Sequence, residues 1–516
     1  MKNFKNAFPP ILWAVVTIAE MILVAFLALT DLLPLNLLVA LILLLILIAV
    51  LNGLLLLTPV RKSGKDAWKR VVGYLLSSVL VLTSVAGVYY LNRTKSAIET
   101  VTTQSNIVAT LGVYTLADNS AEDIKDLADK TFGFLETYDA QRNATAASEI
   151  NEKSGGELTK ENFSTLYELP AALYAGDVDA VVLDEAYASL FTETVVETEV
   201  EEGEEAVDVS VPNYSDFSEK TKLVYEVNIY GEVVEEDDEV GDKNVTNEPF
   251  IIYVSGSDTR STKLTTSRSD VNILVEVNPT THEIIMINTP RDYYIGNPAG
   301  GGTKDKLTHL GIYGIENSMK GLSDLYEVDA DHYVQINFTG FEQLIDNLGG
   351  ITVESLYSFT STRYGGPFTY TTGMNTLSAD AALAFCRDRF EVPGGDVTRG
   401  LHQMNVIKAL VAKVTSSETI LTNYNGLMSG LEGTFTTNFS SEEISDLVKM
   451  QLEDNIQWNI HSFSVQGTGG KETTYSTPST ACYVMLPDNN MVDFAKELLR
   501  KVAEGEILTD DDVVYQ

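Results

Sequence analysis

The chain has 516 residues, more than one hydrophobic core usually organises, so several structural units are expected. Its 73 acidic and 35 basic residues give a formal net charge of −38. This balance argues against duplex nucleic acid as a partner, because such binding depends on basic surface that neutralises phosphates. The two cysteines, Cys386 and Cys482, exclude a disulfide framework, and with the five histidines they show no zinc-site spacing. A single Cys386–Cys482 bridge and two buried thiols both stay open.

Three apolar runs lie near the start of the chain, at residues 11–30, 35–57 and 71–91. Each is close to the roughly 20 residues that a helix needs to cross a bilayer. A cleaved signal peptide is the rival interpretation of residues 1–30, but no small-residue cleavage pattern precedes the second run. We therefore expect residues 1–91 to form three transmembrane helices, although Glu20 interrupts the first.

The basic residues of this part predict its orientation. Lys2 and Lys5 precede the first run and five more basic residues lie between the second and third, whereas the link between the first two carries only Asp31. Positive charge favours the cytoplasmic side, so the N-terminus is expected inside and everything after about Asn92 outside. Residues 1–91 hold seven basic and three acidic residues, which leaves a net charge of −42 for the exported part.

The exported part is expected to contain a polar stalk at 92–106, an α/β accessory domain at 107–247 and a larger domain at 248–516. In the accessory domain, strand-like runs lie at 107–111, 180–183 and 223–227, and a helical pattern lies at 121–134. Acidic runs at 193–208 and 232–242 are typical of solvated loops, with a cation site as the lesser alternative.

The larger domain interleaves strand and helix patterns. A buried-strand pattern at 250–254 leads to Asp258, and strands at 271–277 and 283–288 are predicted to form a hairpin through the turn-like segment 278–282. A helix is predicted from Thr339, capped with Glu342 and ended by Gly349-Gly350. These patterns predict an α/β sandwich.

An arginine cluster is the strongest functional signal. Arg387, Arg389 and Arg399 lie close together, and guanidinium groups match phosphate oxygens and repel one another unless an anion lies between them. If 387–389 is extended, the first two arginines project to one side. Arg399 and Gln403 are four residues apart on a predicted helix and are expected on a polar face, away from the apolar stripe at 404, 407, 411 and 414.

Two glycines precede that predicted helix. Gly394 and Gly395 would let backbone amides approach an anion at the helix N-terminus. Together with the arginines they predict a pyrophosphate site.

Asp258 and Asp270 are the candidate metal ligands, near Arg268. Magnesium binds through one or two carboxylates and completes its shell with water and substrate phosphate. An ordinary Arg–Asp ion-pair network is the alternative. The sequence has no P-loop, nucleophile-elbow or His-Glu-x-x-His motif, so it is not a recognisable nucleotide hydrolase, serine esterase or zinc peptidase.

Several of these motifs, in this order and spacing over about residues 248–415, resemble the LytR-CpsA-Psr (LCP) family. The tail near 483–487 is also similar, and the accessory domain resembles that of the capsule-associated, CpsA-like branch. The matching positions are Asp258, Arg268, Asp270, Arg291-Asp292, Lys306, His309, residues 333–351, Arg387, Arg389, Asp396, Arg399 and Gln403.

The resemblance implies an α/β/α-type domain with a mixed central sheet. It also implies transfer of an anionic glycopolymer, of the capsular-polysaccharide or teichoic-acid type, from a polyprenyl-pyrophosphate carrier to peptidoglycan through a phosphodiester link. By the same resemblance, Arg268, Arg291, Arg387 and Arg389 would be catalytic, and these four with Arg399 and Gln403 would bind the pyrophosphate. Asp258 and Asp270 would hold Mg²⁺. The protein would be a multi-pass bacterial membrane protein, of Gram-positive type, with its C-terminal part outside.

Other points stay open in the sequence. The lipid tail needs an apolar slot, with candidates at 271–277, 341–348 and 404–414, although a core role is favoured for each. Asp292, Asp388 and Asp396 are possible bases, and loops 296–306 and 358–372 are expected to influence polymer choice. A membrane-anchored protein that binds or senses polyprenyl phosphate without turnover is the alternative function. A transcriptional regulator is weaker still, because the cytoplasmic part has no room for a DNA-reading helix.

Overall fold

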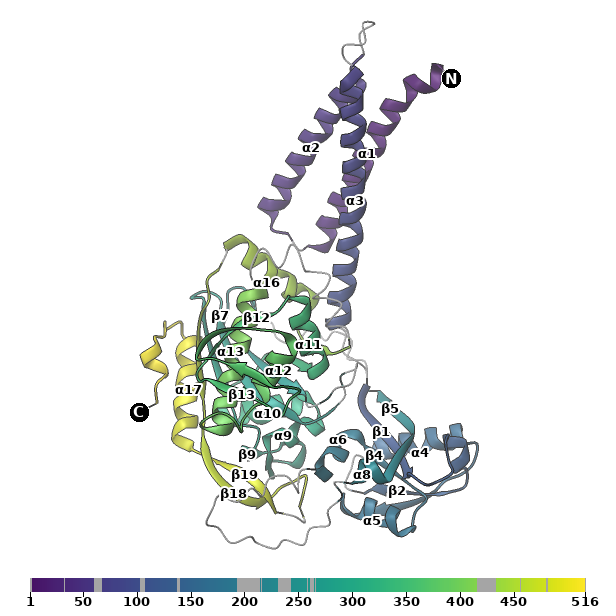
Figure 1. Cartoon of the computed structure of the whole chain (residues 1–516), viewed down its shortest axis with the longest axis vertical. Coiled ribbons are helices and arrows are strands. Elements are labelled where there is room, and N and C mark those ends of the chain that lie inside the picture. Colours follow the sequence, from purple (N-terminus) through teal and green to yellow (C-terminus); the bar gives the residue numbers. More distant parts are fainter. Residues whose placement is uncertain are drawn as a thin grey trace.

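The computed structural model describes residues 2–31, 33–59, 67–102, 107–136, 140–192, 214, 216–230, 243–257, 259, 264, 266–414, 433–454, 456–478 and 481–515. The acidic runs predicted at 193–208 and 232–242, and Asp258, lie outside this part of the chain. Figure 1 shows a stem of three helices above two folded bodies.

The stem consists of α1 (Lys2–Thr30), α2 (Leu35–Leu57) and α3 (Ala67–Thr102). All three are long and apolar enough to cross a membrane. Inside the bundle Asn52 donates to the Ser77 hydroxyl at 2.9 Å, which joins α2 to α3 through a buried polar pair. The first part of the predicted stalk, 92–102, is a continuation of α3. That stretch contains no glycine or proline to end the helix.

The smaller body is built on a five-stranded sheet in the order β3-β2-β4-β1-β5. The strands at 107–111, 180–183 and 223–227 are confirmed as parts of β1, β4 and β5. In the described residues of this body, four helices and two 3₁₀ turns surround the buried core. The elements are β1 (Ile107–Leu116), η1 (Ile124–Leu127), β2 (Thr131–Leu135), α4 (Ala140–Ser154), β3 (Thr159–Phe163), α5 (Glu168–Ala175), β4 (Ala180–Asp184), α6 (Glu185–Ala188), η2 (Ser189–Thr192), α8 (Phe217–Lys220) and β5 (Thr221–Tyr230).

The helix predicted at 121–134 is wrong. Asp123 caps only the short turn η1, in a capping box with Asp126, and Asp129 then takes a left-handed conformation with φ of 59° that ends the turn. Phe132 and Phe134 follow on β2, where both are fully buried. Their two-residue spacing places them on one face of a strand.

The larger body has a six-stranded sheet in the order β16-β11-β6-β7-β8-β17. β6 runs parallel to β11, β8 runs parallel to β17, and the other neighbours are antiparallel, so the sheet is mixed. The predicted hairpin is confirmed as β7 and β8. The strands are β6 (Phe250–Ser257), β7 (Ser269–Asn278), β8 (Glu283–Asn288), β11 (His332–Asn337), β16 (Phe435–Thr437) and β17 (Asn459–Ser464).

Helices cover both faces of this sheet, which confirms the α/β/α class. α10 (Ile315–Tyr326) and α17 (Asn489–Ala503) pack on one face, around Tyr253 and Leu274. α11 (Phe338–Asn347), α12 (Ala379–Arg387) and α13 (Gly395–Val414) lie on the other side, where Met404 packs against Val275.

The larger body also contains short pairs of strands and turns outside the six-stranded sheet. They are β9 (Tyr294–Gly296) with β10 (Lys304–Lys306), β12 (Ile351–Ser355) with β15 (Gly373–Leu377), β13 (Phe359–Ser361) with β14 (Phe368–Tyr370), and β18 (Gly467–Thr473) with β19 (Ala481–Pro487). The remaining elements are η3 (Pro298–Gly300), α9 (Leu307–Leu310), η4 (Gly311–Tyr313), α16 (Ser441–Asp454) and η5 (Asp510–Val513).

The helix predicted from Thr339 is confirmed as α11, but its predicted cap is wrong. Asn337 caps the helix by accepting from the Gly340 amide at 2.9 Å, so the helix starts before Thr339. Gly349 and Gly350 follow its end with φ of 69° and 89°, as expected of residues that stop a helix.

Helix α16 connects the larger body to the stem. It contacts α3, and Lys449 forms an ion pair with Asp31 of the α1–α2 link at 2.5 Å. Figure 1 shows α16 at the end of the larger body that faces the stem. Ile444 and Leu447 of the same helix join the apolar cluster of Val275, which marks this cluster as the stem-facing side of the core.

Candidate active site

A cavity of about 410 Å³ lies between the sheet of the larger body and α11, α12 and α13. This is within the range of small-molecule sites in proteins, roughly 300–1,000 Å³. Its lining is polar at one end and apolar at the other.

Helix α13 passes from polar to apolar along the cavity. Arg399 and Gln403 line it first, and Ile407 and Val411 line it one and two turns later. These positions span about 18 Å at 1.5 Å per residue. Lys408 also reaches the lining, and its ammonium group donates to Ser462 at 3.2 Å.

The sheet shows the same change. On β7 the lining begins with Asp270 and continues through Val271 and Val275 to Val277. The apolar end therefore lies beside Ile284 and Ile460, in the cluster that includes the α16 side chains. A ligand that fits this cavity has a charged head and an apolar tail.

The structure brings most of the predicted anion-binding residues to the polar end. Arg291, Arg387, Arg389, Arg399 and Gln403 all line the cavity. Arg268 lies just before β7 and is not among the described lining residues.

Two of these arginines are held by carboxylates. Arg291 contacts Asp270 at 2.7 Å, and Arg399 contacts Asp396 at 2.6 Å. Arg399 is 8% exposed, so its side chain is fixed within the wall. Such pairing offsets part of the repulsion among the guanidinium groups and leaves their orientation fixed.

Arg387 is held by aromatic rings. Its guanidinium carbon lies 4.3 Å from the ring centre of Phe338 and 4.8 Å from that of Tyr364. Stacking of this kind is a favourable cation–π contact for arginine. Arg387 is the last residue of α12, so only Asp388 and Arg389 of the segment 387–389 lie outside the helix, and Arg387 and Arg389 both line the cavity. Nothing in the sequence pattern identified Phe338 or Tyr364 as partners.

The expected polar face of α13 is also wrong. Arg399 and Gln403 share the cavity-lining side with Ile407 and Val411, because residues four apart on a helix lie one above another. Gly400 allows close packing of α13 on the sheet, since a Cβ there would lie 2.0 Å from the Asn288 amide nitrogen. Gly394 and Gly395 have φ of 81° and 53° at the start of α13 and are not among the described lining residues, so their contribution to an anion site stays a prediction.

Helices α12 and α13 are locked together behind the arginines. Gln403 donates to the Cys386 carbonyl at 3.1 Å. His402 is fully buried and stacks on Phe385 with ring centres 4.1 Å apart. Burial lowers the pKa of His402 to about 4, only partly opposed by Asp388. The ring is therefore a neutral spacer that fixes Arg387 relative to Arg399.

The two cysteines are free, so the bridge between them is not formed. Cys386 lies on α12 and lines the cavity, and burial raises the pKa of its thiol to about 12. Cys482 lies on β19, where Thr477 approaches its sulfur at 3.9 Å.

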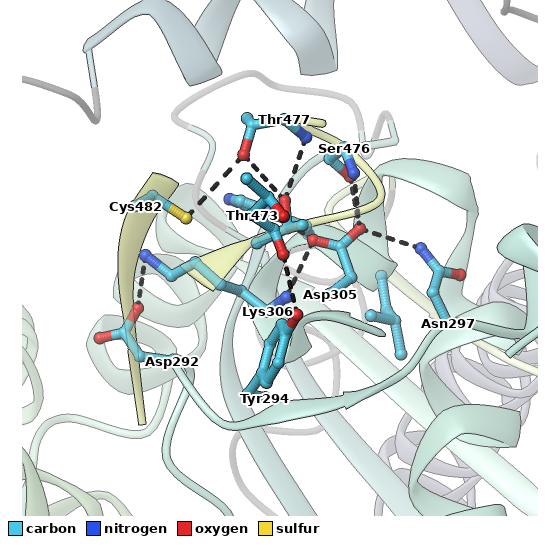
Figure 2. Close-up of polar contacts among 12 residues, drawn as sticks. Asp292, Tyr294, Asn297, Asp305, Lys306, Thr473, Ser476, Thr477 and Cys482 are labelled. Carbon is cyan, nitrogen blue, oxygen red and sulfur yellow. Dashed lines mark hydrogen bonds and ion pairs between the residues drawn. The ribbon is translucent and has the colours of Figure 1, made fainter. Parts of the chain in front are cut away.

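Each of the three possible bases has a polar partner, and none of them is among the described lining residues. Asp292 pairs with the fully buried Lys306 at 2.9 Å (Figure 2), and Asp396 pairs with Arg399. Asp388 is buried and accepts from two backbone amides. Asp270 is the one carboxylate among the described lining residues.

Asp270 offers a partial fit to magnesium. Its contacts with Arg291 and Thr308 both end on Oδ1, so Oδ2 is directed away from them. One carboxylate beside a phosphate is within the usual magnesium pattern. No group of three or more His, Cys, Asp or Glu side chains suited to a metal occurs in the described part of the chain, and Asp258 lies outside it.

A comparison with known protein families matches residues 217–498 of this chain to the LytR_cpsA_psr family. The chain belongs to this family. The match starts ahead of the six-stranded sheet, whose first strand begins at Phe250, and includes the last strand of the smaller body.

Two relatives carry the name polyisoprenyl-teichoic acid–peptidoglycan teichoic acid transferase TagU. That of Enterococcus faecalis is 30% identical over 230 residues, covering 44% of this chain and 73% of the relative. That of Bacillus subtilis is 29% identical over 261 residues, covering 50% and 80%. Among solved structures, B. subtilis TagV is 22% identical with a TM-score of 0.42, covering 51% of this chain and 99% of TagV. B. subtilis TagU is 27% identical with a TM-score of 0.39, covering 51% and 100%.

The buried state of His402 predicts a specific acid sensitivity. An unfolded histidine has a pKa of about 6.5, so the unfolded state takes up this proton first as the pH falls. The stabilisation from the neutral His402 ring is therefore fully present above pH 6.5. As the pH falls from about 6.5 to 4, the free energy of unfolding decreases by on the order of 3 kcal/mol. His402→Phe keeps the ring stack and removes the titration. We expect the melting temperature of the full-length protein in detergent to fall more steeply over this pH range than that of the variant. An equal fall in both proteins would refute the neutral state of His402.

Proposed function

We propose that this protein transfers an anionic glycopolymer, of the teichoic-acid or capsular-polysaccharide type, from a polyprenyl-pyrophosphate carrier to peptidoglycan. The supporting observation is the single cavity whose polar end gathers arginines and whose other end is apolar. A polyprenyl pyrophosphate has this division of charge and hydrocarbon. The relatives named above act, by their names, on polyisoprenyl-linked teichoic acid and peptidoglycan.

In the proposed reaction a peptidoglycan hydroxyl attacks the phosphorus nearest the sugar. A new P–O bond forms to that hydroxyl oxygen, and the P–O bond to the second phosphate breaks. The leaving polyprenyl phosphate takes the bonding electron pair, and the hydroxyl proton goes to it or to solvent. The products are a sugar-phosphodiester link and polyprenyl phosphate, with no oxidant or nucleotide required.

The protein supplies position and charge. Arg387 and Arg399 would bind the phosphate oxygens whose negative charge increases as the bridging bond breaks. Arg291 and Arg389 line the same polar end. Because Asp270 and the two aromatic rings hold Arg291 and Arg387 in place, little rearrangement would be needed during reaction.

Mg²⁺ is part of the proposal. Asp270 would hold it, with Asp258 as the second ligand implied by the family resemblance. When bound, it would supply further positive charge at the pyrophosphate. Arg268, implied as catalytic in the same way, would then act at the edge of the site.

The proposed setting is a bacterial envelope of the Gram-positive type, with the cavity outside the cytoplasm. Membrane anchoring rests on the three apolar helices. The ion pair between Lys449 and Asp31 supports this setting, because it would hold the apolar end of the cavity toward the membrane in which the carrier lies.

Substitution of Arg387 tests the reaction. Full-length protein should release polyprenyl phosphate from a lipid-pyrophosphate-linked glycan when a peptidoglycan acceptor is present. Arg387→Ala should lower the turnover number by about 10²–10³, the usual cost of removing one preorganised donor to developing charge. Arg500→Ala is the matched control, because Arg500 is exposed on α17, on the opposite face of the sheet, and is not among the described lining residues.

The controls separate transfer from simple binding. Equal losses in Arg500→Ala and Arg387→Ala would contradict a specific role for the cavity arginine. Tight lipid binding by wild type without any released polyprenyl phosphate would support the carrier-binding alternative instead.

Magnesium dependence has its own test. Chelation by EDTA should abolish turnover, and added Mg²⁺ should restore it. Asp270→Asn should raise the Mg²⁺ concentration needed for half-maximal turnover, because the amide is a weaker ligand than the carboxylate. Full turnover in EDTA would refute the metal requirement while leaving the arginine assignment intact.

A further inference from the structure

A second cavity, of about 730 Å³, lies between the smaller and the larger body. We call it the interdomain groove. Leu135, Arg142 and Tyr187 line it from the smaller body, and Tyr294, Lys304 and Tyr475 are among its residues from the larger one. It shares no lining residue with the candidate active site.

The groove has an unusual composition for this chain. Four tyrosines line it: Tyr187, Tyr294, Tyr313 and Tyr475. Ser164, Thr303, Ser476 and other residues add hydroxyl groups. Its charged residues are Arg142 and Lys304, and no carboxylate occurs among its described lining residues, although the chain has 73 acidic residues against 35 basic ones.

This chemistry suits an acidic sugar chain. Sugar rings have apolar C–H faces that pack on aromatic rings, and hydroxyl edges that hydrogen-bond with serine, threonine and tyrosine. Arginine and lysine match acidic substituents on such rings. Because the described lining residues include no carboxylate, they do not repel such a ligand.

The wall from the larger body is held rigid. Tyr294 donates to the Thr473 carbonyl at 2.8 Å, and the Lys304 ammonium lies 5.3 Å from the centre of the Tyr294 ring. Behind them the buried Asp305 accepts from Ser476 at 2.6 Å and from Asn297 at 3.1 Å. Figure 2 shows Tyr294 reaching Thr473, and Asp305 between Ser476 and Asn297. The lining side chains are thus preorganised for a ligand.

The two bodies meet directly at the groove. Tyr187 of α6 packs edge-on against Tyr313, with ring centres 6.2 Å apart. Ile312 is fully buried in the hydrophobic core of the smaller body. Figure 1 accordingly shows α6 beside α9. The smaller body therefore supplies one wall of a binding groove that the larger body could not form by itself.

The groove is connected to the candidate active site through the β9–β10 hairpin. Tyr294 follows Arg291 by three residues, which limits their separation along the chain to about 10 Å. On the return strand, Lys304 precedes Thr308, which donates to Asp270 at 3.5 Å. A sugar chain that leaves a pyrophosphate at the arginines has a short route to the groove.

We propose that the interdomain groove binds the acidic sugar chain of the lipid-linked donor. The assignment to the donor rests on the proposed function, whereas recognition of an acidic glycan rests on the groove alone. Its role would be to hold the polymer and thereby to select it.

The test is equilibrium binding of lipid-free glycans to the full-length protein in lipid nanodiscs. The probes are a hyaluronan octasaccharide and a poly(ribitol phosphate) oligomer as acidic chains, maltooctaose as a neutral chain, and a soluble peptidoglycan strand. We expect an acidic probe to bind more tightly than maltooctaose. Lys304→Glu should weaken that binding about tenfold or more, since a charge-assisted contact is replaced by repulsion. Lys304 is exposed, so this change should leave the melting temperature unaltered.

Lys471→Glu is the matched control. Lys471 is also exposed, on the neighbouring strand β18, and it is not among the described lining residues. Equal effects of the two variants, equal binding of maltooctaose, or no binding of either acidic probe would overturn the proposal. If the peptidoglycan strand binds more tightly than the acidic probes and Lys304→Glu weakens that binding, the assignment of the groove to the donor's sugar chain would be overturned.

The assay also separates this proposal from the transfer reaction. The probes contain neither pyrophosphate nor lipid, so Arg387→Ala should bind them as wild type does. Wild-type protein that binds acidic glycans but releases no polyprenyl phosphate would refute transfer and leave the groove's glycan specificity standing.

Discussion

Mutual repulsion among guanidinium groups is the constraint on which this site depends. Four arginines line one end of a single cavity, and each additional positive charge there makes the empty site less stable. The fold offsets this cost with partners that leave the guanidinium groups oriented: Asp270 for Arg291, Asp396 for Arg399, and two aromatic rings for Arg387. An anion that enters between them would relieve the remaining repulsion, which is why we propose a pyrophosphate head group as its ligand.

The remainder of the larger body serves the same arrangement. The His402–Phe385 stack and the Gln403 hydrogen bond fix α12 against α13, and Gly400 lets α13 approach the sheet. Along α13 the polar residues are followed by Ile407 and Val411, so this one helix would contact both the charged head and the apolar tail of the proposed ligand. Helix α16 then closes the apolar side and contacts the stem through Lys449 and Asp31. The stem and the proposed substrate site are therefore linked through neighbouring elements.

The sequence predicted what depends on local periodicity. The apolar runs, the β7–β8 hairpin and the helix that carries Arg399 all have strong patterns, and all are confirmed. The helix expected at 121–134 failed because a two-residue spacing of phenylalanines and a 3₁₀ turn were taken for a helical pattern. The side of α13 that faces the cavity was mispredicted because local spacing does not reveal that a wall can be polar at one end and apolar at the other. Tyr364, Phe338 and His402 were missed because their roles arise from contacts between segments distant in sequence.

The central claim is that one ligand occupies both ends of the cavity, and photo-crosslinking tests it most directly. A polyprenyl phosphate that carries a diazirine at the far end of its tail would be added to the full-length protein in nanodiscs, and crosslinked peptides would be mapped by mass spectrometry. The account predicts crosslinks at the apolar end, around Ile407, Val411 and Ile284, that excess unlabelled polyprenyl phosphate removes and that Arg387→Ala weakens. Crosslinks confined to α1, α2 and α3, with the same yield in the variant, would contradict it.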